Sequence, residues 1–320
     1  MKKKILVLHT GGTIAMSEDK SGQVVQNSNN PLMVNEPEMS DVELTTEDIF
    51  NLPSPHITLE DMLLLKNRIQ QAFSQQDFDG VVITHGTDTL EETAYFLDLT
   101  LPSGKPVAIT GAMRSSNEPG TDGYFNFLSA IRTASDSSSA NRGVLVVMNA
   151  EVHAARFVTK THTTNVSTFQ TPTYGPIGLV TRHRILYHQT LESLETIDCQ
   201  SVAGRVPIIK AYSGMTSETF DLLDLTLLDG LVIEALGAGN LPPAAFSGLK
   251  RLLDAGIPIV LTSRCFNGLA EPIYAYPGGG VELYEAGIMF AQEINSQKAR
   301  IKLIVGLNAD VKNLRSFFER

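Results

Sequence analysis

Two strand-like runs, each ending in a glycine-threonine turn, constrain the fold of this chain most. The apolar run Val81–Ile83 ends in the turn Thr84–Asp88 (THGTD), and a helical pattern follows. The run Ile5–Leu8 ends in the same way, in His9–Thr13 (HTGGT). In an open α/β sheet, ligands bind at the carboxyl ends of strands, where glycine lets the backbone come close to a ligand. The pattern therefore predicts a parallel sheet with a binding site at these strand ends.

The rest of the first half alternates between strand-like and helical patterns. Strands are expected at 4–9, 81–84, 106–110 and 143–148, and helices at 59–75, 89–99 and 123–134. In the helix expected at 59–75, apolar residues recur at helical spacing: Met62, Leu65, Ile69 and Phe73. Continuous apolar strands separated by helices indicate a parallel sheet that is covered on both faces.

A second α/β pattern begins after the periodicity fades between residues 186 and 205. Strands are expected at 206–211, 230–235 and 257–262, and helices at 217–228, 243–254, 295–306 and 309–319. We therefore expect an α/β protein with two α/β domains. The larger, residues 1–185, has a mainly parallel sheet flanked by helices. A linker spans 186–205, and a smaller C-terminal α/β domain spans 206–320.

Composition excludes several classes of partner and cofactor. The net charge is −10 and the charged residues are dispersed, so we expect no nucleic-acid partner. No apolar run approaches the ~18–20 residues that a membrane span needs, so no membrane is expected. The two cysteines and seven histidines show no metal-site spacing, and we expect neither a metal nor a cofactor. The apolar run after Met1–Lys4 is too short for a signal peptide, which indicates a cytoplasmic protein.

The segment 17–36 is polar and has no clear period. A loop of this length in a compact domain is usually functional or disordered. Because it begins soon after Thr13, we expect a lid over the site. The alternative is a surface hairpin without a functional role.

Thr13, Thr87, Asp88 and Lys160 are the residues that could carry chemistry. A threonine hydroxyl is a poor nucleophile unless a base removes its proton. Lys160 can act as a base only after losing its own proton, which burial or nearby positive charge favours. Each residue also has a structural alternative. The threonines could bond their own turns, Asp88 could cap the next helix, and Lys160 could be a solvated surface group.

Several segments together resemble the asparaginase family, the bacterial type with two α/β domains. The two family signatures correspond to 8–15 (LHTGGTIA) and 80–90 (GVVITHGTDTL). Further similar segments are 111–114, 141–149, 158–161, 174–178, 237–240 and 297–300. They occur in the family's order and span nearly the whole chain. Two long signatures in order are far more specific than one glycine-threonine turn.

The resemblance implies that the protein hydrolyses L-asparagine to L-aspartate and ammonia. Thr13 matches the family's nucleophile, and Thr87 and Lys160 match the residues that act with it. The sequence leaves open whether the Thr13 step is covalent and which threonine attacks first. No cofactor is implied.

The resemblance also implies how the substrate is held. Asp88 matches the carboxylate that binds the substrate's α-ammonium, and Ser54 matches the serine that holds its α-carboxylate. Asn240 matches an asparagine contributed by a neighbouring subunit, and Glu282 lies near the position of a glutamate that the neighbour also lends. A homodimer or homotetramer with shared active sites is therefore expected.

Two departures distinguish the chain from many secreted members of the family, and the second relates it to the cytoplasmic type I branch. No tyrosine precedes Tyr95, although many secreted members carry a lid tyrosine. Pro55 follows Ser54, where secreted members often have a glutamine that the intracellular branch lacks.

Three other functions compete with the asparaginase interpretation. One is a glutaminase-asparaginase with broad amide specificity. Another is the amidase subunit of an archaeal amidotransferase, but that subunit usually has an extension before the first signature, which here begins at residue 8. The third is a non-catalytic amino-acid-sensing α/β protein. A sensor would need Ser54 and Asp88 but not Thr13, Thr87 and Lys160 together.

Overall fold

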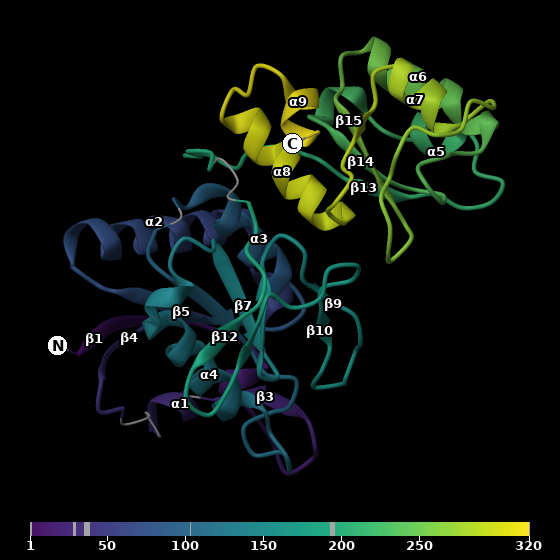
Figure 1. The fold of residues 1–320 in the computed structure, drawn as a ribbon. Helices are drawn as coiled ribbons and strands as arrows, with labels where there is room; N and C mark the ends of the chain where they lie inside the picture. Colours follow the sequence, from purple (N-terminus) through teal and green to yellow (C-terminus); the bar gives the residue numbers. More distant parts are fainter. Residues whose placement is uncertain (1, 28–29, 35–38, 103, 193–195, 320) are drawn as a thin grey trace. The chain divides into compact units, whose positions relative to one another are not determined.

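The structure is a computed structural model that describes residues 2–27, 30–34, 39–102, 104–192 and 196–319. The chain divides into two compact units, Met1–Thr196 and Ile197–Arg320 (Figure 1). The first contains a large sheet flanked by helices, and the second contains a smaller parallel sheet with helices. This arrangement confirms the predicted fold class.

The sheet of the first unit has the strand order β12-β11-β8-β7-β6-β5-β1-β4. Its strands are β1 (Lys3–Gly11), β4 (Val42–Leu52), β5 (Gly80–Thr84), β6 (Val107–Thr110), β7 (Val144–Met148), β8 (Glu151–Ala154), β11 (Gly178–Val180) and β12 (Ile185–Tyr187). The five strands from β4 to β7 pair in parallel, and β8, β11 and β12 pair antiparallel. The carboxyl ends of β4, β1, β5 and β6 therefore lie side by side, along the edge of the sheet that runs across the strand ends.

The helices of the first unit are α1 (Pro31–Val34), α2 (Leu59–Gln75), α3 (Leu90–Thr100) and α4 (Gly123–Ser135). α4 packs on β1, β5, β6 and β7, and α3 packs on β6 and β7. On β1, Val7 shares a core cluster with Ile131 of α4, while the alternate residues Leu6 and Leu8 are equally buried. Because alternate residues face opposite sides of a sheet, the central strands are buried on both faces.

α2 has the bounds that its apolar spacing predicts. Thr58 and Asp61 form a capping box, in which each side chain accepts a hydrogen bond from the other residue's backbone N–H. Met62, Leu65 and Ile69 are buried, so one face of the helix supplies core contacts.

The sequence patterns did not predict β4. This strand mixes apolar residues with Glu43, Glu47 and Asp48, and acidic residues are uncommon in strands. It is the edge strand of the sheet and, among the described strands, pairs only with β1, from Lys3↔Val42 to Gly11↔Leu52. An edge strand keeps one side open to solvent, which accommodates these charges.

The second unit has a four-stranded parallel sheet of order β13-β14-β15-β16. The strands are β13 (Ile208–Lys210), β14 (Leu231–Ala235), β15 (Ile259–Ser263) and β16 (Met289–Phe290). The helices are α5 (Glu218–Asp221), α6 (Phe246–Asp254), α7 (Gly280–Glu285), α8 (Ser296–Asn308) and α9 (Leu314–Phe318). Leu231, Ile233 and Leu261 of the sheet pack with Leu249 of α6 in one apolar core.

The helix expected at 217–228 is wrong in extent. Only α5 is α-helical, and a 3-10 turn, η4 (Leu225–Leu227), follows it. The Asp224 carboxylate accepts hydrogen bonds from the backbone N–H and the hydroxyl of Thr226, a local turn that competes with helix formation. Leu222 is 87% exposed, so continuing the helix would bury nothing there.

Glycines bring the turns after β1 and β5 into direct backbone contact. A Cβ atom on Gly12 would lie 2.2 Å from the Cα of Gly86 and 2.4 Å from its nitrogen. Gly12 also has a φ of 81°, in the left-handed region that favours glycine. A Cβ on Gly11 would lie 2.5 Å from the backbone nitrogen of Leu52, at the end of β4. The ends of three neighbouring strands therefore touch with no side chain between them.

We expect Gly12→Ala to lower the free energy of unfolding by about 2–5 kcal/mol, the sum of left-handed strain and overpacking. Gly22→Ala is the matched control, because Gly22 has a φ of 79° and nothing within 4 Å of its Cβ position. The control should lose only the ~1–2 kcal/mol of left-handed strain. Urea unfolding of both variants measures the difference, and equal losses would contradict the backbone contact.

Candidate active site

Three turns at one edge of the first sheet carry four of the expected site residues. Thr13 begins the 3-10 turn η1 (Thr13–Ala15) directly after β1, and Ser54 begins η2 (Ser54–His56) after β4. Thr87 and Asp88 lie between β5 and α3. A Cβ on Gly86 would lie 2.8 Å from Ser54 Oγ, so the second and third turns also pack closely.

Lys160, which comes much later in the sequence, contacts two of these residues. It belongs to the short strand β9 (Thr159–Lys160), which pairs antiparallel with β10 (Phe169–Gln170). Its Nζ lies 2.9 Å from Thr87 Oγ1 and 2.7 Å from Asp88 Oδ1. The Lys160 side chain is 16% exposed and that of Asp88 is 61% exposed. The ion pair thus has its lysine largely enclosed and its carboxylate open to solvent.

Ser54 is buried and is held by the Asp88 turn. Its Oγ accepts a hydrogen bond from the backbone N–H of Asp88 at 3.1 Å. Its carbonyl accepts one from the Thr89 hydroxyl at 2.8 Å. Since Ser54 Oγ acts only as an acceptor in these contacts, its hydroxyl hydrogen remains able to bind an anionic group.

Two of the structural alternatives raised by the sequence do not apply. The residue preceding α3 at its N-cap is Thr89, not Asp88, and no side-chain capping bond is formed there. The Thr13 hydroxyl, half-buried, has no hydrogen bond to any residue in the described part of the chain, although its carbonyl accepts from Met16. Both side chains therefore remain able to contact a ligand.

A pocket of about 310 Å³ opens beside the ion pair. It is lined by Asp88, Lys160, Thr161, His162 and Thr163. The His162 ring is fixed because its Nδ1 accepts from the backbone N–H groups of Thr164 and Asn165. The charged pair therefore faces a space that a small polar molecule can enter.

Two buried histidines support the strand ends in neutral form. Burial lowers the pKa of His85 to about 4, although its contact with the Gly86 carbonyl opposes this shift. Its Nδ1 lies 2.7 Å from that carbonyl and its Nε2 lies 2.9 Å from Thr93 Oγ1. Since a carbonyl only accepts, Nδ1 carries the proton and Nε2 accepts from the Thr93 hydroxyl. This bond fixes the orientation of the Gly86 peptide.

His9, at the end of β1, is also buried and neutral. Burial lowers its pKa to about 4, and the Asp48 carboxylate partly opposes this shift. Its Nδ1 lies 2.6 Å from Thr84 Oγ1.

The sequence did not point to the residues that fix the neighbouring turn after β6. Gly111 lies there, and a Cβ on it would be 3.1 Å from Thr87 Cγ2. The Asp122 carboxylate accepts from the backbone N–H groups of Met113 and Arg114, and Asn126 Nδ2 donates to the Gly111 carbonyl. The only sequence signal was polar residues at the start of a predicted helix, which are usual there.

The described part of the expected lid contains an antiparallel hairpin of β2 (Met16–Glu18) and β3 (Val24–Gln26). Its first strand is fixed to the loop after β6. The Ser17 and Ser116 hydroxyls lie 2.8 Å apart, and the Glu18 N–H donates to Asn117 Oδ1. Residues 28–29 and 35–36 of the expected lid lie outside the described residues.

Asn240 and Glu282 belong to the second unit, separate from the residues above. Both side chains accept hydrogen bonds from the backbone of one glycine-rich loop in that unit. Asn240 Oδ1 accepts from the Gly280 N–H at 3.1 Å, and Glu282 Oε2 accepts from the Gly278 N–H at 2.6 Å. The structure therefore brings five of the seven expected residues together within one unit and leaves two in the other.

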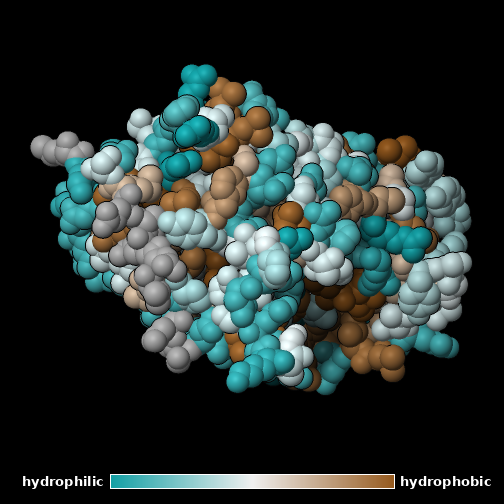
Figure 2. All heavy atoms as spheres, turned by 90° about the horizontal axis from the view of Figure 1, so that it is seen from below, coloured by the Kyte–Doolittle hydropathy of each residue, from teal (hydrophilic) through white to brown (hydrophobic). Residues whose placement is uncertain are grey.

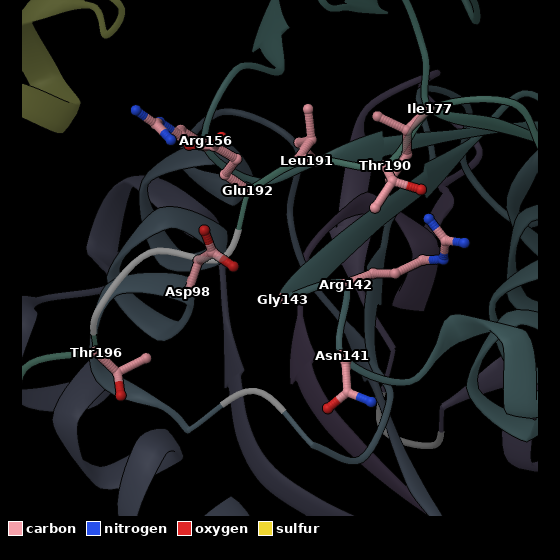
Figure 3. A pocket seen from close by; sticks show the side chains of 11 residues that line it. Asp98, Asn141, Arg142, Gly143, Arg156, Ile177, Thr190, Leu191, Glu192 and Thr196 are labelled. Atoms are coloured by element: carbon pink, nitrogen blue, oxygen red, sulfur yellow. The ribbon is translucent and has the colours of Figure 1, made fainter. Parts of the chain in front are cut away.

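A second, smaller pocket of about 50 Å³ lies at the opposite edge of the first sheet, where β7 begins (Figure 3). Two of its polar side chains form hydrogen bonds within the protein. Arg142 donates to the carbonyls of Ser138 and Gln189, and Asp98 Oδ1 accepts from the Val144 N–H. These groups stabilise the loop before β7.

The described residues include no group of three or more histidine, cysteine, aspartate or glutamate side chains that could hold a metal ion. None of the helices formed by those residues is long and apolar enough to cross a membrane.

Comparisons with known proteins agree with the fold. The family model "Asparaginase, N-terminal" matches residues 4–193, and "Glutaminase/Asparaginase C-terminal domain" matches residues 205–318. These matches define a two-domain α/β protein of the amidohydrolase type. The chain belongs to the asparaginase family.

Individual relatives match the chain over almost its full length. A probable L-asparaginase of Deinococcus radiodurans is 40% identical over 98% of this chain and 97% of its own. The L-asparaginase of Bacillus licheniformis is 33% identical over 99% of both chains. Among solved structures, a probable cytoplasmic L-asparaginase from Campylobacter jejuni has a TM-score of 0.88 and 31% identity, with all of both chains covered.

The buried histidines predict that the protein loses stability on acidification between pH 6.5 and about 4. In this range the unfolded chain binds protons at histidines that remain neutral in the folded chain, so the free energy of unfolding falls as the pH decreases. The loss approaches on the order of 3 kcal/mol for each histidine. We expect His85→Asn to make this dependence shallower, as measured by urea unfolding at several pH values. The control His183→Asn, at an exposed histidine, should leave it unchanged. An unaltered dependence in His85→Asn would contradict the neutral buried state.

Proposed function

We propose that this protein hydrolyses L-asparagine to L-aspartate and ammonia, with Thr13 as the nucleophile. The observation that carries the proposal is the contact of Lys160 Nζ with both Thr87 Oγ1 and Asp88 Oδ1, at the strand edge where Thr13 also lies. Membership of the asparaginase family supports the substrate. The chemistry uses only groups of the chain and water, so no cofactor enters it.

Asp88 and Ser54 hold the two ends of the substrate's amino-acid group. The exposed Asp88 carboxylate binds the α-ammonium through the oxygen that does not face Lys160. Ser54 donates its free hydroxyl hydrogen to the α-carboxylate. Holding both groups aligns the side-chain amide for attack, which removes much of the entropic barrier.

The reaction proceeds in two steps. The Thr13 oxygen forms a bond to the amide carbon, and Thr87 and Lys160 pass the hydroxyl proton on to the amide nitrogen. Backbone N–H groups of the glycine turns stabilise the oxyanion. The C–N bond breaks, and the transferred proton allows ammonia to leave. Water then cleaves the β-aspartyl ester, which releases aspartate and restores the Thr13 hydroxyl.

We further propose that the active site is shared between subunits of a homodimer or homotetramer. Asn240 Nδ2 and Glu282 Oε1, the atoms that do not bond to their own loop, would reach a neighbour's site, with Glu282 directed to the α-ammonium. Their glycine-rich loop continues a segment with exposed apolar side chains, including Phe266 (58% exposed), Ile273 (59%) and Tyr276 (49%). Hydrophobic residues also form separate groups between hydrophilic ones on the face drawn in Figure 2. Exposed apolar side chains of this kind are typical of protein interfaces.

The resemblance to the type I branch and the similarity to a probable cytoplasmic L-asparaginase support a cytoplasmic location. A glutaminase-asparaginase is the second candidate function, because the matched C-terminal domain family is named for both glutaminase and asparaginase.

Thr13→Ala should fold normally, because the Thr13 hydroxyl makes no hydrogen bond within the described part of the chain that its loss would break. It should lose ~10³-fold or more in kcat, the scale expected for removal of an activated nucleophile. Steady-state release of ammonia from asparagine measures the loss, and circular dichroism checks the fold. Thr13→Ser, which keeps a hydroxyl, is the matched control and should retain far more activity. A Thr13→Ala variant within tenfold of the unmodified protein would refute the assignment.

We expect kcat/KM for asparagine to exceed that for glutamine at least ~100-fold. When Asp88 and Ser54 hold its α-groups, glutamine places its amide one methylene farther from the α-carbon than asparagine does. A methylene is worth ~10–200-fold in binding discrimination, and misalignment of the reacting carbon adds up to ~10²-fold. Ammonia release measured with each amide gives the ratio. Comparable values would favour the glutaminase-asparaginase function instead.

A further inference from the structure

Glu91 is a buried carboxylate that the proposed reaction does not use. It lies in the first turn of α3, and only 4% of its surface is exposed. Burying a carboxylate is costly unless hydrogen bonds or opposite charges compensate it. Such a residue in a helix that otherwise supplies core side chains therefore calls for a physical explanation.

Glu91 binds the strand that carries Lys160. Its Oε1 accepts a hydrogen bond from the Thr159 hydroxyl at 2.9 Å and one from the backbone N–H of Lys160 at 3.3 Å. One carboxylate oxygen thus fixes both residues of β9.

β9 needs such support because its own pairing is small. It has two residues, which pair with Phe169 and Gln170 of β10. Beyond them the hairpin continues with the Thr161 N–H, which donates to the Thr168 carbonyl, and residues 161 to 165 of the connecting loop are exposed. A two-stranded hairpin without further packing is at best marginally stable in water. The hydrogen bond to Glu91 therefore ties the backbone of Lys160 to α3 from outside the hairpin.

The same stretch of chain carries the groups that Lys160 must reach. Thr87 and Asp88 precede Glu91 by four and three residues, and all three lie in or next to the first turn of α3. Lysine has a long flexible stem, so the position of its amine depends on where its backbone is held. Glu91 holds that backbone relative to the segment that presents Thr87 Oγ1.

We propose that Glu91 is a positioning residue, which holds β9 against α3 so that Lys160 Nζ stays within hydrogen-bond distance of Thr87. The inference rests on the proposed catalytic function of Lys160. Glu91 acts through Lys160 and does not touch the substrate.

Glu91→Ala should therefore lower kcat for asparagine ~10- to 100-fold, the range expected when a reacting group is displaced by about an ångström. The KM should change less than about threefold, because Asp88 and Ser54 keep their contacts. Glu91→Gln retains an acceptor oxygen and should keep more activity than the alanine variant. Thr159→Val removes one of the two hydrogen bonds without changing a charge and should lower kcat in the same direction. Glu60→Ala, at an exposed glutamate in the first turn of α2, is the matched control and should leave kcat unchanged.

A double-mutant cycle with Lys160→Met separates positioning from general stabilisation. If Glu91 acts through Lys160, Glu91→Ala should cause no further loss of kcat in the Lys160→Met background. An equal loss in both backgrounds would overturn the inference and leave the function of Lys160 intact. So would a Glu91→Ala variant that melts earlier but keeps full kcat while folded. If Lys160→Met alone retained full kcat, the proposed function of Lys160 would fail, and the inference with it.

Discussion

Gly12 and Gly86 pack backbone against backbone, and this contact holds the candidate site together. A single added carbon on Gly12 would lie 2.2 Å from Gly86. The close approach brings the turn after β1, with Thr13, against the turn after β5, with Thr87 and Asp88. The parallel pairing of β4, β1 and β5 aligns these strand ends, but only residues without side chains allow the turns to touch.

Charge and burial divide the site into a supporting layer and a reactive layer. Beneath the turns, His9 and His85 are buried and neutral, so they orient hydroxyl and carbonyl groups without adding charge. At the surface of the turns, Asp88 is largely exposed and pairs with the more enclosed Lys160. The Asp88 carboxylate thus faces both Lys160 and the open pocket, which links the place where an α-ammonium would bind to the proposed base. Glu91 adds support from the helix side by fixing the backbone of β9.

Local patterns predicted the elements that bury apolar residues at a regular period. Residues 59–75 are an example, because Thr58 caps that helix and its apolar face is buried. The same reasoning failed where neighbours decide the structure. β4 carries acidic residues and exists because β1 offers it a pairing partner. The helix expected at 217–228 stops early, and the Asp224 carboxylate forms a local turn with Thr226 instead. The contacts of Asp122 and Glu91 were not predictable either, because acidic residues at a helix start are common and carry no sign of a partner distant in sequence.

The sequence by itself determined the α/β class, the strand-end position of Thr13 and Thr87, and, through two long signatures, the family. These features depend on short stretches of chain, in which residue spacing and glycine conformation act locally. Only the tertiary structure decided that Lys160 lies 2.7 Å from Asp88, that Ser54 accepts from the Asp88 N–H, and that Glu91 holds β9. Those contacts join residues 34 to 72 positions apart. Such pairs meet only when the sheet orders its strands and the helices pack on it, so no local pattern encodes them.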